Sequence, residues 1–87
     1  MQVAVWDTFV KRGDGRTMHF DIIAPAEIKD AAVIYGYGRD YLKEKGEDSQ
    51  TLTSNECSFC HVDEVQPQWV KAIEEKGYFI YEMENCD

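Results

Sequence analysis

The fold of this 87-residue chain is decided by the stretch VAVWDTFVKRGDGRTMHFDII, residues 3–23. Apolar and polar residues alternate over residues 3–10 and again over residues 18–23, which is typical of β-strands with one buried face. Between them stands Gly13-Asp14-Gly15, a strong hairpin signal. We therefore expect a β-hairpin in which Asp14 and Gly15 form a two-residue turn.

This turn predicts a polar cluster on one face of the hairpin. It sets Thr8 opposite Asp21 and brings Thr8, His19 and Asp21 to the same face. An imidazole beside a carboxylate can act as a base or as a ligand near neutral pH, which makes these three residues catalytic candidates. No serine or cysteine nucleophile is assured beside them, so the alternative is an exposed polar face with cross-strand hydrogen bonds. Asp7 has apolar neighbours, and we expect a backbone N–H, lysine or arginine to bind its carboxylate.

The rest of the chain alternates helices and strands. The sequence indicates a helix over residues 28–45 that ends at Gly46, a polar loop at 47–50, a strand in the later half of 51–62, a helix that opens at Pro67 and stops at Gly77, and a strand over 78–84. The resulting order, ββαβαβ, predicts a single α+β domain over residues 1–87. We expect a two-layer sandwich, with both helices on one face of a four-stranded mixed sheet.

Gly36 and Gly38 stand inside the first predicted helix, where each glycine costs about 1 kcal/mol relative to alanine. Close packing of the helix on the sheet explains such glycines. A phosphate-binding loop is the alternative, but the segment lacks a third glycine and does not directly follow a strand.

Composition excludes several classes of partner. The net charge is −8, from 17 acidic and 9 basic residues, and nucleic acids are bound through clustered lysine and arginine, so we expect no nucleic-acid binding. No apolar run is long enough for a transmembrane helix, so we expect no membrane partner. Residues 1–7 resemble a strand rather than a secretory signal, which predicts a cytoplasmic protein with three free thiols.

The run Cys57-Ser58-Phe59-Cys60-His61 has the letters of a haem, redox or zinc motif. Attachment of c-type haem requires export, so haem is not expected. A thioredoxin-type pair needs its first cysteine at a helix N-terminus, whereas the next predicted helix opens only at Pro67. A thiol-redox function therefore remains an alternative rather than the expected function.

Zinc is the other alternative, with Cys57 and Cys60 as two ligands and His61, Cys86 and His19 as candidates for the other two. If this run is a strand, Cys57 and His61 share one face and Cys60 lies on the other, so the two thiols cannot chelate one ion. Cysteine is often simply a small buried residue, and we expect no cofactor at this motif.

Aromatic residues exceed what a small core can hide. Some of them should line a groove, a protein-binding surface or a homodimer interface. The candidates are Tyr35, Tyr37, Tyr41, Trp69, Tyr78, Phe79 and Tyr81.

Four segments mark the chain from end to end: VWDTFVK (5–11), MHFD (18–21), ECSFCH (56–61) and KGYFIYEMENC (76–86). Through them the chain resembles an uncharacterised family of small bacterial proteins, a domain of unknown function. The resemblance implies a compact α/β domain and brings no catalytic residue. Two functions stay open: a non-enzymatic binding or regulatory module, and a thiol or zinc protein that uses Cys57, Cys60 and His61.

Overall fold

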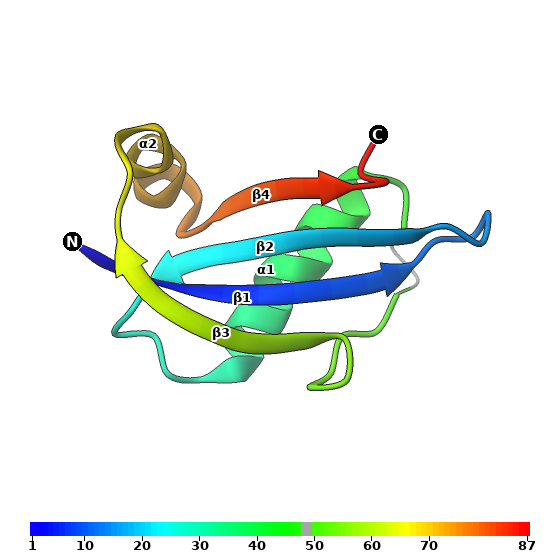
Figure 1. The fold of residues 1–87 in the computed structure, drawn as a ribbon, viewed down its shortest axis with the longest axis horizontal. Coiled ribbons are helices and arrows are strands. Elements are labelled where there is room, and N and C mark those ends of the chain that lie inside the picture. Colours follow the sequence, from blue (N-terminus) through cyan, green and yellow to red (C-terminus); the bar gives the residue numbers. More distant parts are fainter. Residues whose placement is uncertain (48–49) are drawn as a thin grey trace.

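The computed structural model describes residues 1–47 and 50–87 and shows one four-stranded sheet with two helices (Figure 1). The α+β class and the order ββαβαβ are confirmed. The predicted loop at residues 47–50 lies partly outside the described residues. The elements are β1 (Gln2–Lys11), β2 (Thr17–Pro25), α1 (Ala31–Glu44), β3 (Cys57–Glu64), α2 (Pro67–Lys76) and β4 (Phe79–Glu84).

The helix ends follow local capping. The carboxylate of Asp30 accepts a hydrogen bond from the Ala32 backbone N–H, so α1 starts later than the predicted residue 28. Gly46 and Gly77 follow the two helices with φ angles of 80° and 94°, as predicted for glycines that end helices. In the part of the chain that the structure describes, neither helix is both long and apolar enough to cross a membrane.

The sheet has the strand order β3-β1-β2-β4, and every neighbouring pair is antiparallel. The predicted mixed sheet is therefore wrong. The crossover through α1 does join two strands of the same direction, β2 and β3, but β1 lies between them. Because parallel strands never become neighbours, all ladders stay antiparallel.

The hairpin loop is longer than predicted. The Gly15 N–H donates to the Arg12 carbonyl at 3.0 Å, and the Arg12 N–H donates to the Arg16 carbonyl at 2.7 Å. Gly15 adopts a φ of 91°, so the loop contains a four-residue turn over residues 12–15 that ends in a left-handed glycine, not a two-residue turn. This shifts the register by one residue, and Asp7, rather than Thr8, lies opposite Asp21.

The helices cover opposite faces of the sheet, and the prediction of both on one face is wrong. Figure 1 shows α1 running behind the sheet, while α2 stands at the end where β3 finishes and β4 begins. Two separate buried clusters mark the two faces. The first joins α1 to Ala4, Trp6, Met18, Phe20 and Ile22, and the second joins Trp69 and Ile73 of α2 to Val3, Val5 and Ile23.

The reason lies in β1 and β2 themselves. At one end of the hairpin, residues 3–6 and 22–24 are apolar at every position, so both faces of the sheet need a cover there. Beyond that end, the face turned away from α1 carries Asp7, Phe9, His19 and Asp21, and α2 does not reach over it. We call this uncovered surface the open face.

Gly38 confirms the predicted close packing of α1. A Cβ atom there would lie 3.0 Å from Ile22 Cδ1 and still nearer to Leu52 Cδ1. At Gly36 a Cβ atom would meet only the Arg39 guanidinium, at 3.7 Å, which is ordinary contact. Close packing therefore explains one of the two helical glycines.

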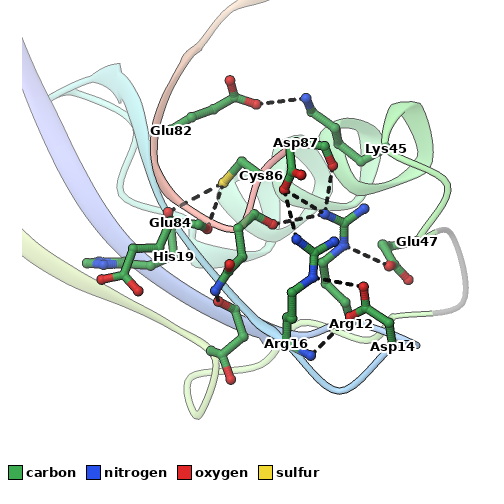
Figure 2. Close-up of polar contacts among 12 residues, drawn as sticks. Arg12, Asp14, Arg16, His19, Lys45, Glu47, Glu82, Glu84, Cys86 and Asp87 are labelled. Atoms are coloured by element: carbon green, nitrogen blue, oxygen red, sulfur yellow. Dashed lines mark hydrogen bonds and ion pairs between the residues drawn. The ribbon is translucent and has the colours of Figure 1, made fainter.

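The C-terminal residues are held against the hairpin loop (Figure 2). Arg12 donates to Glu47 at 3.1 Å, to the Asn85 carbonyl at 2.9 Å and to the Asp87 carbonyl at 2.8 Å. Arg16 adds a contact to the Asp87 carboxylate at 3.0 Å. These charge-assisted hydrogen bonds fix the segment that follows β4.

Candidate functional site

The open face carries a cluster of Asp7, His19 and Asp21. Asp7 and Asp21 are direct cross-strand partners on the two central strands. His19 stands two residues before Asp21 and lies on the same face of β2. One potential ligand atom from each side chain lies within 4.8 Å of the others. Within residues 1–47 and 50–87, this is the one such group of three or more histidine, cysteine, aspartate or glutamate side chains.

The imidazole of His19 has a defined orientation. Its ring stacks on Phe9, with 4.1 Å between ring centroids and 15° between planes. Its Nε2 lies 3.3 Å from Asp7 Oδ1. The cluster thus receives one oriented ring nitrogen beside two carboxylates.

Asp21 is the most deeply buried member of the cluster. It is 8% exposed, and its Oδ1 has no hydrogen-bond partner among the residues that the structure describes. It lies in a hollow of about 220 Å³ whose other walls include His61, Asp63, Trp69, Tyr81 and Met83. A buried carboxylate without a full set of partners is costly, so a ligand is the expected complement.

The two carboxylates titrate in opposite directions. Burial, and then the hydrogen bond and charge of Asp7, raise the pKa of Asp21 to about 7. The hydrogen bond from Asp21, followed by that of His19, lowers the pKa of Asp7. Below about pH 7 the pair therefore retains one proton, which Asp21 holds and donates to the Asp7 carboxylate.

Thr8 is not part of this cluster, which corrects the predicted trio of Thr8, His19 and Asp21. Its side chain is fully buried on the α1 face, and its hydroxyl donates to the Trp6 carbonyl at 3.3 Å. The cause is the one-residue shift in the hairpin, since adjacent strand residues point to opposite faces. Asp7 takes the place of Thr8, and its partners are His19 and Asp21 rather than the expected backbone N–H, lysine or arginine.

A bulge rearranges the cysteine motif on β3. Val5 pairs with His61 and Trp6 pairs with Phe59, so Cys60 is an additional residue between them. Cys57 is 1% exposed and lies opposite Thr8, on the α1 face. His61 lines the hollow on the open face, so the prediction that Cys57 and His61 share a face is wrong.

The candidate thiol ligands occupy different surroundings. The Cys60 sulfur lies 3.3 Å from His61 Nδ1 at the exposed sheet edge. Cys86 is buried, with its sulfur near the backbone oxygens of Glu84 and His19 (Figure 2). All three cysteines are free, and zinc binding by these thiols stays a prediction.

The three thiols should differ strongly in reactivity. In the native protein, Cys60 should react with iodoacetamide at least about tenfold faster than Cys57 or Cys86, because burial shields both and raises the pKa of Cys57. Mass spectrometry of peptides after timed quenching measures each rate. In urea all three rates should converge, whereas equal rates in the folded protein would contradict this placement.

The aromatic residues that were expected to be too many for the core fall into a buried group and an exposed group. Tyr41, Trp69 and Tyr78 are buried, whereas Tyr81 is 49% exposed. Phe9, also 49% exposed, lies with Tyr81 on the open face, which the sequence did not indicate for Phe9. Two exposed aromatic rings, those of Phe9 and Tyr81, therefore border the polar cluster.

Residues 1–83 match the family described as "Domain of unknown function (DUF2024)". The chain is also similar to protein NE1680 from Nitrosomonas europaea, a structural genomics target solved by NMR. The two share 40% sequence identity and a TM-score of 0.85, and the match covers 100% of both chains. No curated protein matches the chain. These matches confirm the resemblance seen in the sequence, and the chain belongs to the DUF2024 family of bacterial domains of unknown function.

Proposed function

We propose that this domain is a non-enzymatic binding module that receives a positively charged group of its ligand on the open face. The observation that carries this proposal is the buried Asp21 carboxylate, which lines a hollow and has one oxygen without a partner among the described residues. A cation there would satisfy the oxygen that the protein leaves unpaired.

The charges around the hollow support a cationic ligand. Asp21 and Asp63 line the hollow with the imidazole of His61, and the cluster beside it adds the Asp7 carboxylate and the imidazole of His19. The whole chain adds a net charge of −8, which attracts cations and repels anions on approach.

The rim of the open face adds apolar contact. Phe9, Tyr81 and Met83 are between 44% and 49% exposed, and the two rings present faces that attract cations. A ligand with a positive charge on an apolar stem, such as an arginine side chain of a protein partner, fits both features. Three free cysteines support the proposal that the module works in the cytoplasm.

Binding rather than catalysis is proposed because of what His19 contacts. Its ring meets a carboxylate and the Phe9 ring, and among the described residues no hydroxyl or thiol is hydrogen-bonded to the imidazole nitrogens. The thiol alternative has one supporting contact, between Cys60 and His61. A dithiol–disulfide cycle would also need Cys57, which is buried on the other side of the sheet.

NMR titration tests the proposed binding face. The probe is the blocked tripeptide alanyl-arginyl-alanine, and the matched control is its citrulline analogue, which keeps the shape without the charge. We expect the arginine peptide to shift amide signals of residues 5–9, 19–21 and 81–83, and the citrulline peptide to shift them much less.

Two variants sharpen this experiment. Asp21→Asn should weaken the response, whereas Glu74→Gln, which removes an equal charge from the exposed side of α2, should leave it intact. Equal shifts with both peptides, or an unchanged response in Asp21→Asn, would overturn the proposed function.

A further inference from the structure

We propose that Asp7, His19 and Asp21 form a binding site for a single divalent first-row transition-metal ion, with zinc as its representative. The inference rests on the proposed function, because the ion is a second kind of positive charge that the open face can receive. It concerns a site distinct from the cysteine motif, from which it takes no ligand.

The spacing of the ligand atoms suits one ion. Zinc binds imidazole nitrogen and carboxylate oxygen at about 2.0–2.2 Å, so two ligands of one ion lie no more than about 4.4 Å apart. The ligand atoms of Asp7, His19 and Asp21 lie within 4.8 Å of one another. Small side-chain rotations therefore close the site without moving the strands.

A second observation points to the same place. Asp21 is more than nine-tenths buried, at 8% exposure, and its Oδ1 lacks a partner among the described residues. Both partner groups in reach, Asp7 and His19, belong to the same cluster. A metal ion bound by all three would give the orphaned oxygen its missing partner and offset the repulsion between the two carboxylates.

The donor set selects the class of ion. Two carboxylates and one imidazole suit zinc, manganese, iron or cobalt, whereas magnesium and calcium prefer oxygen ligands alone. The protein also orients the nitrogen, because Phe9 holds the imidazole with Nε2 next to Asp7. An oriented ligand loses less conformational entropy when the ion binds.

The backbone beneath the site is rigid. β1 and β2 are the two inner strands, so each is hydrogen-bonded on both sides. Because Asp7 and Asp21 are direct partners in the ladder, the distance between their backbones is fixed by the sheet. The hollow beside Asp21 leaves room for a further ligand, such as water or a group of the bound partner.

Titration of chelator-treated protein with Co²⁺, followed by visible absorption and by calorimetry, tests the site. We expect one ion per chain and full displacement of cobalt by Zn²⁺. Asp21→Asn and His19→Gln should each weaken binding by roughly 100-fold or more, since each removes a direct ligand. A thermal unfolding curve for each variant verifies that it is folded.

Control variants separate this site from the cysteine motif. Cys57→Ser and Cys60→Ser should each retain cobalt binding within about threefold, because neither thiol supplies a ligand in the proposed site. Loss of binding in these variants, with binding kept in Asp21→Asn, would overturn the inference in favour of a thiol site. Absence of binding to the wild-type protein would overturn it outright.

The result is distinguishable from failure of the proposed function. If cobalt does not bind but the arginine peptide still shifts the open face, the metal site is rejected and the binding module stands. If neither binds, both proposals fall.

Discussion

Replacing Asp21 with asparagine should stabilise the metal-free protein at pH 8, raising the free energy of unfolding by about 1–3 kcal/mol, the cost of a buried polar group without a partner. In the wild-type protein the Asp21 carboxylate is 8% exposed and faces Asp7 directly across the ladder. Asparagine has a similar shape and no charge, and its amide can donate to Asp7. A residue that lowers stability in this way is one that function retains.

The size of this gain should depend on pH. Burial and then Asp7 raise the pKa of Asp21 from 3.8 to about 7. A raised carboxyl pKa stabilises the fold fully below the unfolded value of 3.8, and that contribution is lost as the pH rises through 7. Between about pH 4 and pH 8 the free energy of unfolding of Asp21→Asn should therefore rise relative to that of the wild-type protein. Asp7, His19, His61 and Asp63 also face this carboxyl group and are unchanged in the variant.

Urea unfolding with a chelator present, at pH 5 and pH 8, measures this effect. Asp63→Asn is the matched control, because the Asp63 side chain is 53% exposed and its removal should change stability little. If Asp21→Asn is less stable than the wild-type protein at pH 8, the prediction is contradicted. The Asp21 carboxylate would then have its full set of hydrogen-bond partners in the metal-free protein.

Truncating Phe20 to alanine should lower the free energy of unfolding by about 3–5 kcal/mol. Phe20 is fully buried on β2, and its ring lies 4.7 Å from the Tyr41 ring of α1. It therefore joins an inner strand to the helix that covers it. The alanine variant leaves a cavity at the centre of the α1 cluster.

Two further variants keep this prediction testable if Phe20→Ala does not fold. Phe20→Leu retains most of the volume and should cost about 1–2 kcal/mol. Phe59→Ala removes a ring that is 52% exposed on the edge strand β3 and should cost less than about 1 kcal/mol. Equal losses for Phe59→Ala and Phe20→Leu would contradict the assignment of the core.

Most of the secondary structure could be predicted because its signals are local. Alternation marked β1 and β2, Pro67 and Gly77 marked the ends of α2, and the glycine-rich loop marked the hairpin. The strand order and the side of the sheet that α2 covers are long-range properties. The sequence did contain a clue to the side that α2 covers, since both faces of the hairpin are apolar at residues 3–6 and 22–24.

The site was predicted in part. His19 and Asp21 were placed on one face, which the structure confirms. Their partner was missed because the hairpin register depends on a single residue in the loop, and a shift of one exchanges Thr8 for Asp7. The signal that could have found Asp7 was the charge itself, which stands among apolar neighbours in β1.

The side of the sheet on which His61 lies depends on the bulge in β3. Simple alternation put it with Cys57, but the additional residue Cys60 turned it to the open face. Bulges of one residue leave little trace in a sequence of this length, because the flanking strand residues keep their usual composition. The cysteine motif thus lies on an edge strand, and the hairpin residues Asp7, His19 and Asp21 form the cluster.

Paramagnetic NMR of the wild-type protein with substoichiometric Mn²⁺ tests the central claim most directly. If Asp7, His19 and Asp21 bind the ion, amide signals should broaden first in residues 5–9 and 19–23, on the two inner strands. The flanking segments 58–62 and 80–83 should follow, while α1 should remain sharp. Broadening centred on residues 57–61 alone, on the C-terminal residues or evenly over all acidic side chains would contradict the proposed site.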